Sequence, residues 1–360
     1  MAGSGAEARP GTPIMETADV RAAIAWQADH AERADAPITG RIVRAELAIL
    51  DTGIELARRM TNWPGLSLED AMPLRIAGGL HWLHLSGAEP RLAPVYSGEV
   101  TDQEMVNAIV TSVAAAWDAK LVPWLDHPPQ TNEAGRSSSI MAGLLWLSLC
   151  VGPKFEMNEI GASAGVNTMM ERYRYDLGGV EVGPANSPMH LKPEWRGSSP
   201  PAGKVEIVAI RGCDVAPVDL SDAAEALRLK AYVWADAQER MVRIDAAAGL
   251  AAEKPPLLEP KDAGTFVDEC VEAPQESGVT RVLYHSVMWQ YLPEATRTSI
   301  TAAMEQAGSR ATAERPLAWI RLETNRATFR HELSIRYWPG GEEPVTLSEA
   351  HPHGAWLIWH

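Results

Sequence analysis

A glycine-rich corner between an apolar strand and a helical pattern constrains the fold of this chain more than any other feature. The strand is expected over residues 155–161, and the corner reads Gly161-Ala162-Ser163-Ala164-Gly165. Small residues let the backbone approach a ligand closely, and a helix over 166–176 would offer free N–H groups at its N-terminus. The pattern therefore predicts a strand–corner–helix unit able to hold a nucleotide-like molecule.

The spacing of the glycines excludes two common classes of nucleotide site. A dinucleotide fingerprint needs GxGxxG, whereas Gly161 and Gly165 form GxxxG with Glu159 before it. No Lys-Ser/Thr pair follows, which excludes a triphosphate P-loop. A tight turn that binds no ligand is the alternative that the motif alone leaves open.

Strands and helices alternate after the corner. Apolar strands are expected at residues 205–212, 257–260, 280–287 and 317–323, with helices at about 222–252 and 293–306 between them. The C-terminal segments 332–341 and 354–360 predict an antiparallel hairpin. The pattern is typical of an α/β fold with a Rossmann-like, mostly parallel sheet and an antiparallel addition at its edge.

Length and periodicity predict more than one domain. The chain has 360 residues, whereas a single hydrophobic core rarely exceeds about 250–300 residues. We expect a disordered tail at 1–16, a helical N-terminal domain at 17–128 that serves as lid or substrate wall, and a cofactor-binding domain at 129–360. An insertion at about 178–203 is rich in Gly, Pro and Ser.

Composition narrows the functional classes. Lys and Arg total 32 against 47 Asp and Glu, a formal net charge of −15, which argues against a nucleic-acid partner. The three cysteines lie far apart without CxxC spacing, which favours a reducing cytoplasm over a disulfide framework or a cysteine zinc site. The longest apolar stretch is too short to span a bilayer, so we expect no membrane partner.

Two aspartates follow strands at positions suited to a cofactor. Asp214 ends the strand that begins near residue 205, where its carboxylate could accept hydrogen bonds from ribose hydroxyls. Asp262 follows the short strand 257–260. The alternative for each is a helix cap or a turn residue.

Seven strings of the chain resemble the bacterial domain-of-unknown-function family 2332 over roughly residues 20 to 360. They are QTNEAGR, EIGASAGVN, ERYRYD, GCDVAPVDL, VWADAQERMVR, HSVMWQYL and HPHGAWLIW. Sequences of that family resemble class I S-adenosylmethionine (SAM) methyltransferases with a helical N-terminal extension. The insertion at 178–203 departs from the typical methyltransferase pattern.

The resemblance implies SAM as cofactor, S-adenosylhomocysteine as product and a SAM methyltransferase-type sheet. The cofactor-binding residues implied are Glu159, Gly161, Ala162, Ser163, Gly165, Asn167, Asp214, Val215, Asp262, Ala263, His285 and Ser286. Asp214 would contact the ribose and Asp262 the adenine amino group.

Candidate catalytic residues must position an acceptor or remove its proton, because the sulfonium methyl group is already activated. The candidates are His285, Asn132, Tyr173 and His353. A hydrogen-bonded core histidine is the alternative for His285, and a helix cap is the alternative for the loop that holds Asn132. His351 and His353 have H-x-H spacing but lie in a turn without an evident third ligand, so we expect no metal.

Candidate substrate-binding residues concentrate polar groups around a small ligand. They are Gln130, Glu133, Arg136, Tyr175 and Trp289. Core packing is the alternative for Tyr173 and Tyr175.

The leading functional hypothesis is a cytoplasmic SAM-dependent methyltransferase of a small molecule. A SAM-utilising enzyme that transfers or cyclises another part of SAM stays open, as does a non-catalytic nucleotide- or metabolite-binding protein on a Rossmann-like scaffold. The glycine spacing disfavours an NAD(P) oxidoreductase. The oligomeric state is undetermined, with a homodimer left open.

Overall fold

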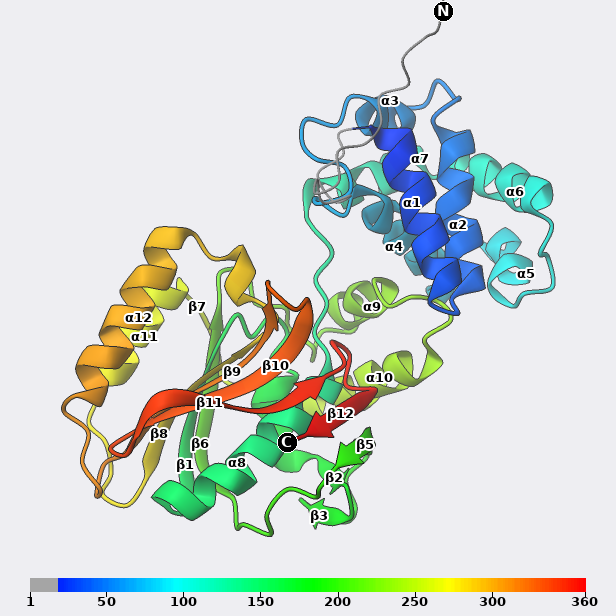
Figure 1. Cartoon of the computed structure of the whole chain (residues 1–360). Helices are drawn as coiled ribbons and strands as arrows, with labels where there is room; N and C mark the ends of the chain where they lie inside the picture. Colours follow the sequence, from blue (N-terminus) through cyan, green and yellow to red (C-terminus); the bar gives the residue numbers. More distant parts are fainter. Residues whose placement is uncertain (1–18) are drawn as a thin grey trace, which may run out of the picture. The chain divides into compact units, whose positions relative to one another are not determined.

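The chain divides into two compact units in a computed structural model that describes residues 19–360, apart from the side chain of Glu342. The first unit runs to Thr131 and also includes Leu227–Met241, and the second comprises Asn132–Ala226 and Val242–His360 (Figure 1). The domain boundary expected after residue 128 lies three residues before the first division of the chain. The tail expected at 1–16 lies outside the described residues.

The first unit is helical. Asp19 caps its first helix and Asp102 caps α6, each by accepting hydrogen bonds from backbone N–H groups. Its elements are α1 (Val20–Arg33), α2 (Pro37–Ile49), α3 (Glu55–Thr61), α4 (Met72–Leu85), η2 (Pro90–Leu92), α5 (Ala93–Tyr96), α6 (Gln103–Ala116), α7 (Asp118–Leu121) and η3 (Val122–Asp126).

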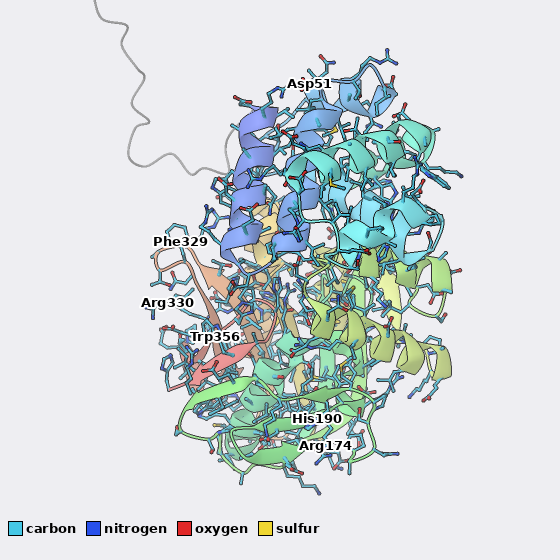
Figure 2. All side chains as sticks on the ribbon, turned by 90° about the vertical axis from the view of Figure 1, so that its right-hand side faces the viewer. Asp51, Arg174, His190, Phe329, Arg330 and Trp356 are labelled. Carbon is cyan, nitrogen blue, oxygen red and sulfur yellow. The ribbon has the colours of Figure 1, made fainter. Side chains whose placement is uncertain are left out.

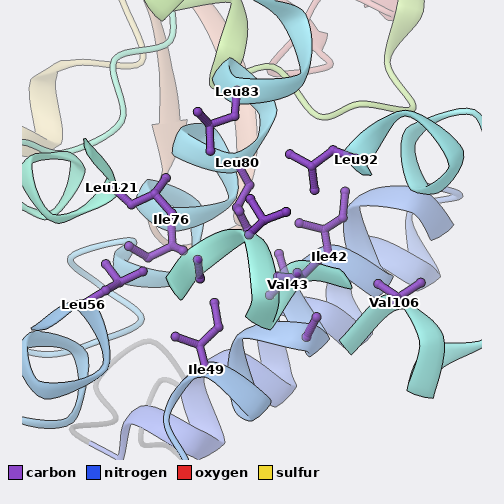
Figure 3. Close-up of a cluster of buried hydrophobic side chains, with 14 of the residues drawn as sticks. Ile42, Val43, Ile49, Leu56, Ile76, Leu80, Leu83, Leu92, Val106 and Leu121 are labelled. Atoms are coloured by element: carbon purple, nitrogen blue, oxygen red, sulfur yellow. The ribbon is translucent and has the colours of Figure 1, made fainter. Parts of the chain in front are cut away.

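The core of the helical unit is built from the apolar faces of these helices. Aliphatic side chains from α2, α3, α4, α6 and α7 meet in the cluster drawn in Figure 3. The returning segment 227–241 is tied to α2 by Asp236. Its carboxylate accepts hydrogen bonds from the N–H groups of Ile38 and Thr39, at 2.9 Å each, and from the Thr39 hydroxyl at 2.8 Å. Asp236 thus caps α2 from nearly 200 positions further along the chain.

The second unit has a large, mostly parallel sheet at its centre. The strands are β1 (Lys154–Ile160), β5 (Glu194–Gly197), β6 (Glu206–Asp214), β7 (Leu258–Pro260), β8 (Thr280–Ser286), β9 (Leu317–Asn325), β10 (Arg330–Trp338), β11 (Gly341–Ala350) and β12 (Trp356–Trp359), in the spatial order β5-β12-β11-β10-β9-β8-β1-β6-β7. The strands from β7 to β9 are parallel, and β10 to β12 continue antiparallel. The predicted α/β class and antiparallel C-terminal strands are confirmed, but the hairpin expected between 332–341 and 354–360 is wrong, because β11 lies between these segments and pairs with both.

Alternation along the strands assigns side chains to two faces. Leu283, Leu317 and Trp338 join a buried cluster with α11 (Ala263–Glu272) and α12 (Glu294–Gly308), which lie side by side in Figure 1. Leu333 and Ile335 lie on the opposite face, against Gly143 of α8 (Ser137–Val151). Neighbouring residues of one strand therefore belong to different layers.

The order of the parallel strands reverses between β1 and β8. Chain connections leave β1 towards β6 and β7 on one side, and return to β8 and β9 on the other. In open α/β sheets ligands bind at the carboxyl ends of the strands beside such a reversal. The glycine corner follows β1 at that edge.

The helix predicted over 166–176 is wrong. The structure has a six-residue 3₁₀ helix, η5 (Asn167–Arg172), after a left-handed Gly165, and then strand β2 (Arg174–Leu177). Tyr173, Tyr175 and Leu177 are buried, whereas the residues between them are partly exposed. This period of two suits a strand and not a helix.

The insertion at 178–203 forms β structure. Strands β3 (Val180–Val182) and β4 (His190–Leu191) flank β2 in a small second sheet, where Arg174 pairs with His190 as labelled in Figure 2. Strand β5 leaves the insertion to pair with β12.

The single helix expected at 222–252 is two helices, α9 (Ala223–Ala231) and α10 (Gln238–Glu253). On length and composition, residues 134–151 could span a membrane, but 72% of that segment is buried inside the protein. A bent pair formed by Gln103–Ala116 and Asp118–Asp126 passes the same criterion. A core helix gives this result as readily as a membrane span.

Candidate functional site

The glycine corner is closed by the carboxylate at the end of the neighbouring strand. Asp214 Oδ2 accepts a hydrogen bond from the Ser163 N–H at 2.9 Å, and Oδ1 accepts one from Ala216 N–H at 3.0 Å. Gly161, Ser163 and Gly165 have φ values of 66°, 52° and 69°. Two of these left-handed positions are thus taken by glycine, as the geometry favours.

The remaining N–H groups of the corner are mostly engaged within the protein. Ala162 N–H donates to the Cys213 carbonyl at 2.9 Å, and Gly165 N–H donates to the Ala162 carbonyl at 2.8 Å. Asn132 Oδ1 accepts from Val166 N–H at 2.7 Å. Asn132 therefore fixes the C-terminal side of the corner.

Side chains cover the open faces of both glycines. A Cβ at Gly161 would lie 2.8 Å from the methyl group of Met288, and one at Gly165 would lie 2.8 Å from the ring of Pro256. Packing alone therefore requires glycine at both positions. A ligand that approaches Gly161 must displace Met288, which is flexible and partly exposed.

Glu159 is a buried acid at the end of β1, 1% exposed. The Tyr284 hydroxyl donates to Glu159 Oε2 at 3.3 Å. Burial raises the pKa of Glu159 to about 8, which the Tyr284 hydrogen bond and the charge of Arg136 only partly offset. This carboxyl group therefore exchanges a proton close to neutral pH.

His285 lies on the other face of the sheet, because it follows Tyr284 directly. Its Nδ1 lies 2.6 Å from Glu323 Oε1, and its ring stacks on Trp289 with centroids 4.9 Å apart. The same Glu323 oxygen accepts hydrogen bonds from the N–H groups of Met288 and Trp289 at 3.1 and 3.3 Å. Glu323 thus fixes both the imidazole and the turn after β8.

Two candidate tyrosines are engaged in the interior. The Tyr173 hydroxyl donates to the Val166 carbonyl. The Tyr175 hydroxyl donates to the Met170 carbonyl at 2.9 Å, and its oxygen lies 3.2 Å from Ser137 Oγ. Both residues are fully buried, so their observed role is to anchor η5 and β2 behind the corner.

A second polar cluster joins three distant segments of the same unit. Arg243 Nη1 donates to Glu133 Oε1 at 3.0 Å and to the His353 carbonyl at 3.1 Å. Arg136 Nε donates to the Pro352 carbonyl at 2.8 Å, and its Nη1 lies 3.4 Å from the Ser286 carbonyl. The turn 351–354 is thereby held against the start of α8.

The other candidates lie at the margins of the corner or outside it. Asp262 is exposed and caps α11 through Gly264 and Thr265 N–H groups, with Ala263 buried as the first helical residue. Val215 is 77% exposed, and Gln130 belongs to the helical unit. Within residues 19–360 no three His, Cys, Asp or Glu side chains are grouped to hold a metal ion.

Sequence reasoning missed Glu323 and Tyr284. Periodicity gives the face of each residue within its own strand, but their partners also require the register between strands. His285 pairs with Arg321 in the parallel register of β8 and β9, so Glu323, two residues on, shares the face of His285. The same period places Tyr284 with Glu159 on the other face.

Comparison with known proteins gives a family but no characterised relative. No curated protein and no solved structure matches the chain. A family model described as "Uncharacterized protein conserved in bacteria (DUF2332)" matches residues 21–359. The chain therefore belongs to this bacterial family.

Proposed function

We propose that this protein is a SAM-dependent methyltransferase that acts on a small molecule. One observation carries the proposal: a carboxylate at the end of β6, Asp214, lies against a GxxxG corner at the end of adjacent β1, 2.9 Å from Ser163 N. The order of the five parallel strands agrees with a Rossmann-like sheet of the SAM methyltransferase type.

An unpaired polar atom at this edge agrees with a polar cofactor. Ser163 Oγ is buried and has no hydrogen-bond partner among residues 19–360. Natural proteins rarely leave such atoms unsatisfied, and a bound ligand would satisfy this one. Asp214 retains lone pairs for two ribose hydroxyls, because each carboxylate oxygen accepts only one hydrogen bond from residues 19–360.

The bound cofactor would supply an activated methyl group. This chain would contribute position and proton control. Asp214 would orient the ribose, and Asn132 would keep the corner in its bound shape. Glu159 would accept or release a proton near neutral pH, since burial raises its pKa to about 8.

A non-catalytic metabolite-binding protein is the second candidate. Coverage of Gly161 by Met288 and of Gly165 by Pro256 shows that the corner is a packed structural turn, which requires no catalytic group near it. Transfer or cyclisation of another part of SAM would use the same corner.

Calorimetry with SAM and S-adenosylhomocysteine tests the cofactor. We expect Asp214→Asn to weaken SAM binding at least about tenfold, the effect of losing a charge-assisted hydrogen bond. The amide oxygen can still accept from Ser163 N–H, so the corner should stay folded. Asp268→Asn, on the exposed side of α11, is the matched control. NAD binding without SAM binding would refute the proposal.

Mass spectrometry after incubation with SAM separates the alternatives. Release of S-adenosylhomocysteine supports methyl transfer, whereas methylthioadenosine indicates another SAM reaction. Binding without any turnover across an acceptor panel favours the metabolite-binding protein.

A further inference from the structure

A hollow of about 240 Å³ lies beside Trp289 and Glu323. Trp289, Gln290, Arg297, Glu323, Thr324 and Arg326 line it. The volume is below the roughly 300–1,000 Å³ of pockets for drug-sized ligands. A molecule of amino-acid size would fill it, whereas a nucleotide would not.

Two arginines of this hollow lack an ionic partner. Three other arginines, in β10 and after α12, have carboxylate partners: Arg310 pairs with Glu272 at 2.8 Å, Arg330 with Glu349 at 2.6 Å and Arg336 with Glu305 at 3.0 Å. No carboxylate in the described chain lies within ion-pair distance of Arg297 or Arg326. In a chain of net charge −15, two unpaired guanidinium groups beside one hollow are suited to an anion.

The opposite wall carries a negative group. Glu323 Oε1 receives its three hydrogen bonds from His285, Met288 N–H and Trp289 N–H. No hydrogen bond to Oε2 occurs within residues 19–360, and the side chain is 16% exposed. This second oxygen is available to a cationic or N–H donor of a ligand.

The charges around the hollow are separated, since Glu323 forms no ion pair with Arg297 or Arg326. A ligand with its own separated charges would match both sides. Trp289, whose ring rests on His285 at a 14° interplanar angle, offers an apolar face beside them. Arg297 and Trp289 also border an open groove of about 580 Å³ along α12, with room for a longer side chain.

We propose that this hollow is the substrate site, and that it binds a zwitterionic α-amino acid through Arg297, Arg326 and Glu323. The assignment as substrate site rests on the proposed methyltransferase function, while the binding itself does not. Arg297 and Arg326 hold the carboxylate, and Glu323 receives the ammonium group.

The twenty common L-amino acids, titrated singly into the full-length protein by calorimetry, test the proposal. At least one should bind, and its N-acetyl and carboxamide derivatives should bind at least about tenfold more weakly, because each lacks one charge. Arg297→Gln and Arg326→Gln should each weaken binding to a similar degree. Arg310→Gln, whose partner is Glu272, should leave affinity unchanged.

SAM titrations separate this inference from the proposed function. SAM should bind Arg297→Gln as tightly as the wild type and should not compete with the amino acid. If no amino acid binds, or if affinity is insensitive to both arginine variants, the site is refuted even when SAM binds. Competition with SAM would also overturn it, since the hollow would then hold the aminobutyrate arm of the cofactor. Amino-acid binding without SAM binding supports the hollow and refutes the methyltransferase.

Discussion

The buried carboxyl group of Glu159 provides the most direct test of the site's electrostatics. Its pKa lies near 8 in the folded protein against an ordinary value of 4.5, chiefly because burial penalises the charged form. The neutral form therefore contributes stability that is fully present below pH 4.5 and is lost as the pH rises through about 8. Each pH unit between these values lowers the free energy of unfolding by about 1.4 kcal/mol.

Glu159→Gln removes this titration while keeping the shape of the side chain. We expect the wild type to lose roughly 3 kcal/mol relative to the variant between about pH 5.5 and pH 7.5. Urea unfolding of both proteins across this range measures the difference between their free energies of unfolding. We use the difference because a chain of two units need not unfold in a single two-state transition, which makes each absolute value less well defined. Glu206→Gln, at the exposed start of β6, is the control and should follow the wild type.

Parallel pH profiles for the wild type and Glu159→Gln would refute the account of a neutral buried acid. Infrared difference spectra supply an independent measurement. The spectrum of the wild type minus that of Glu159→Gln at pH 7 should contain the carbonyl band of one protonated carboxyl group, because the buried acid Glu46 is common to both proteins and cancels. Tyr284→Phe should shift the titration further upward, because it removes the donor that lies 3.3 Å from Glu159 Oε2.

Three further predictions concern stability and are measured by thermal or urea unfolding. Gly161→Ala should lower the free energy of unfolding by about 2–4 kcal/mol, because its methyl group meets both a left-handed backbone and a clash with Met288. Gly179 has a φ of 91° but open space around it, so Gly179→Ala should lose only the part that comes from backbone strain. Equal losses in the two variants would contradict the packing argument. Asp236→Ala should cost about 0.5–2 kcal/mol by uncapping α2, and no loss would mean that the cap is not formed in solution. The stability of Glu46→Gln relative to the wild type should increase as the pH rises, because burial raises the pKa of Glu46 well above its ordinary range and the wild type loses stability as this group is deprotonated. A difference that does not depend on pH would refute this prediction.

The sequence was sufficient for the parallel strands of the sheet because they carry clear apolar patterns, whereas β11 was not predicted. Strands β1, β6, β8 and β9 lie where residues 155–161, 205–212, 280–287 and 317–323 predicted them. The prediction of a helix after the corner was wrong for a physical reason. Its apolar residues fit a helical period, but the tyrosines Tyr173 and Tyr175 alternate with charged residues and bury both rings on one side of a strand.

Side-chain contacts between segments far apart in the sequence could not be predicted from the sequence patterns. The sequence assigned Asp214 and the corner to one cofactor site, but it did not predict the hydrogen bond between Asp214 and Ser163 N–H. It did not predict that Met288 would cover Gly161, because side-chain packing after β8 has no periodic signature. Arg297 and Arg326 were also missed, since an unpaired arginine is recognisable only when its neighbours' ion pairs are known.

The alternation of β8 has a consequence for how the two candidate sites relate. Tyr284 points to Glu159 on one face, and His285 points to Glu323 on the other. The corner with its titrating acid and the hollow beside Trp289 are therefore separate groups of side chains that share the carboxyl edge of one strand. Because Glu159 and Arg297 have no common hydrogen-bond partner, the effects of Glu159→Gln on the pH profile and of Arg297→Gln on amino-acid affinity should be additive in the double variant. A strong coupling between them would mean that a single ligand contacts both faces of the edge.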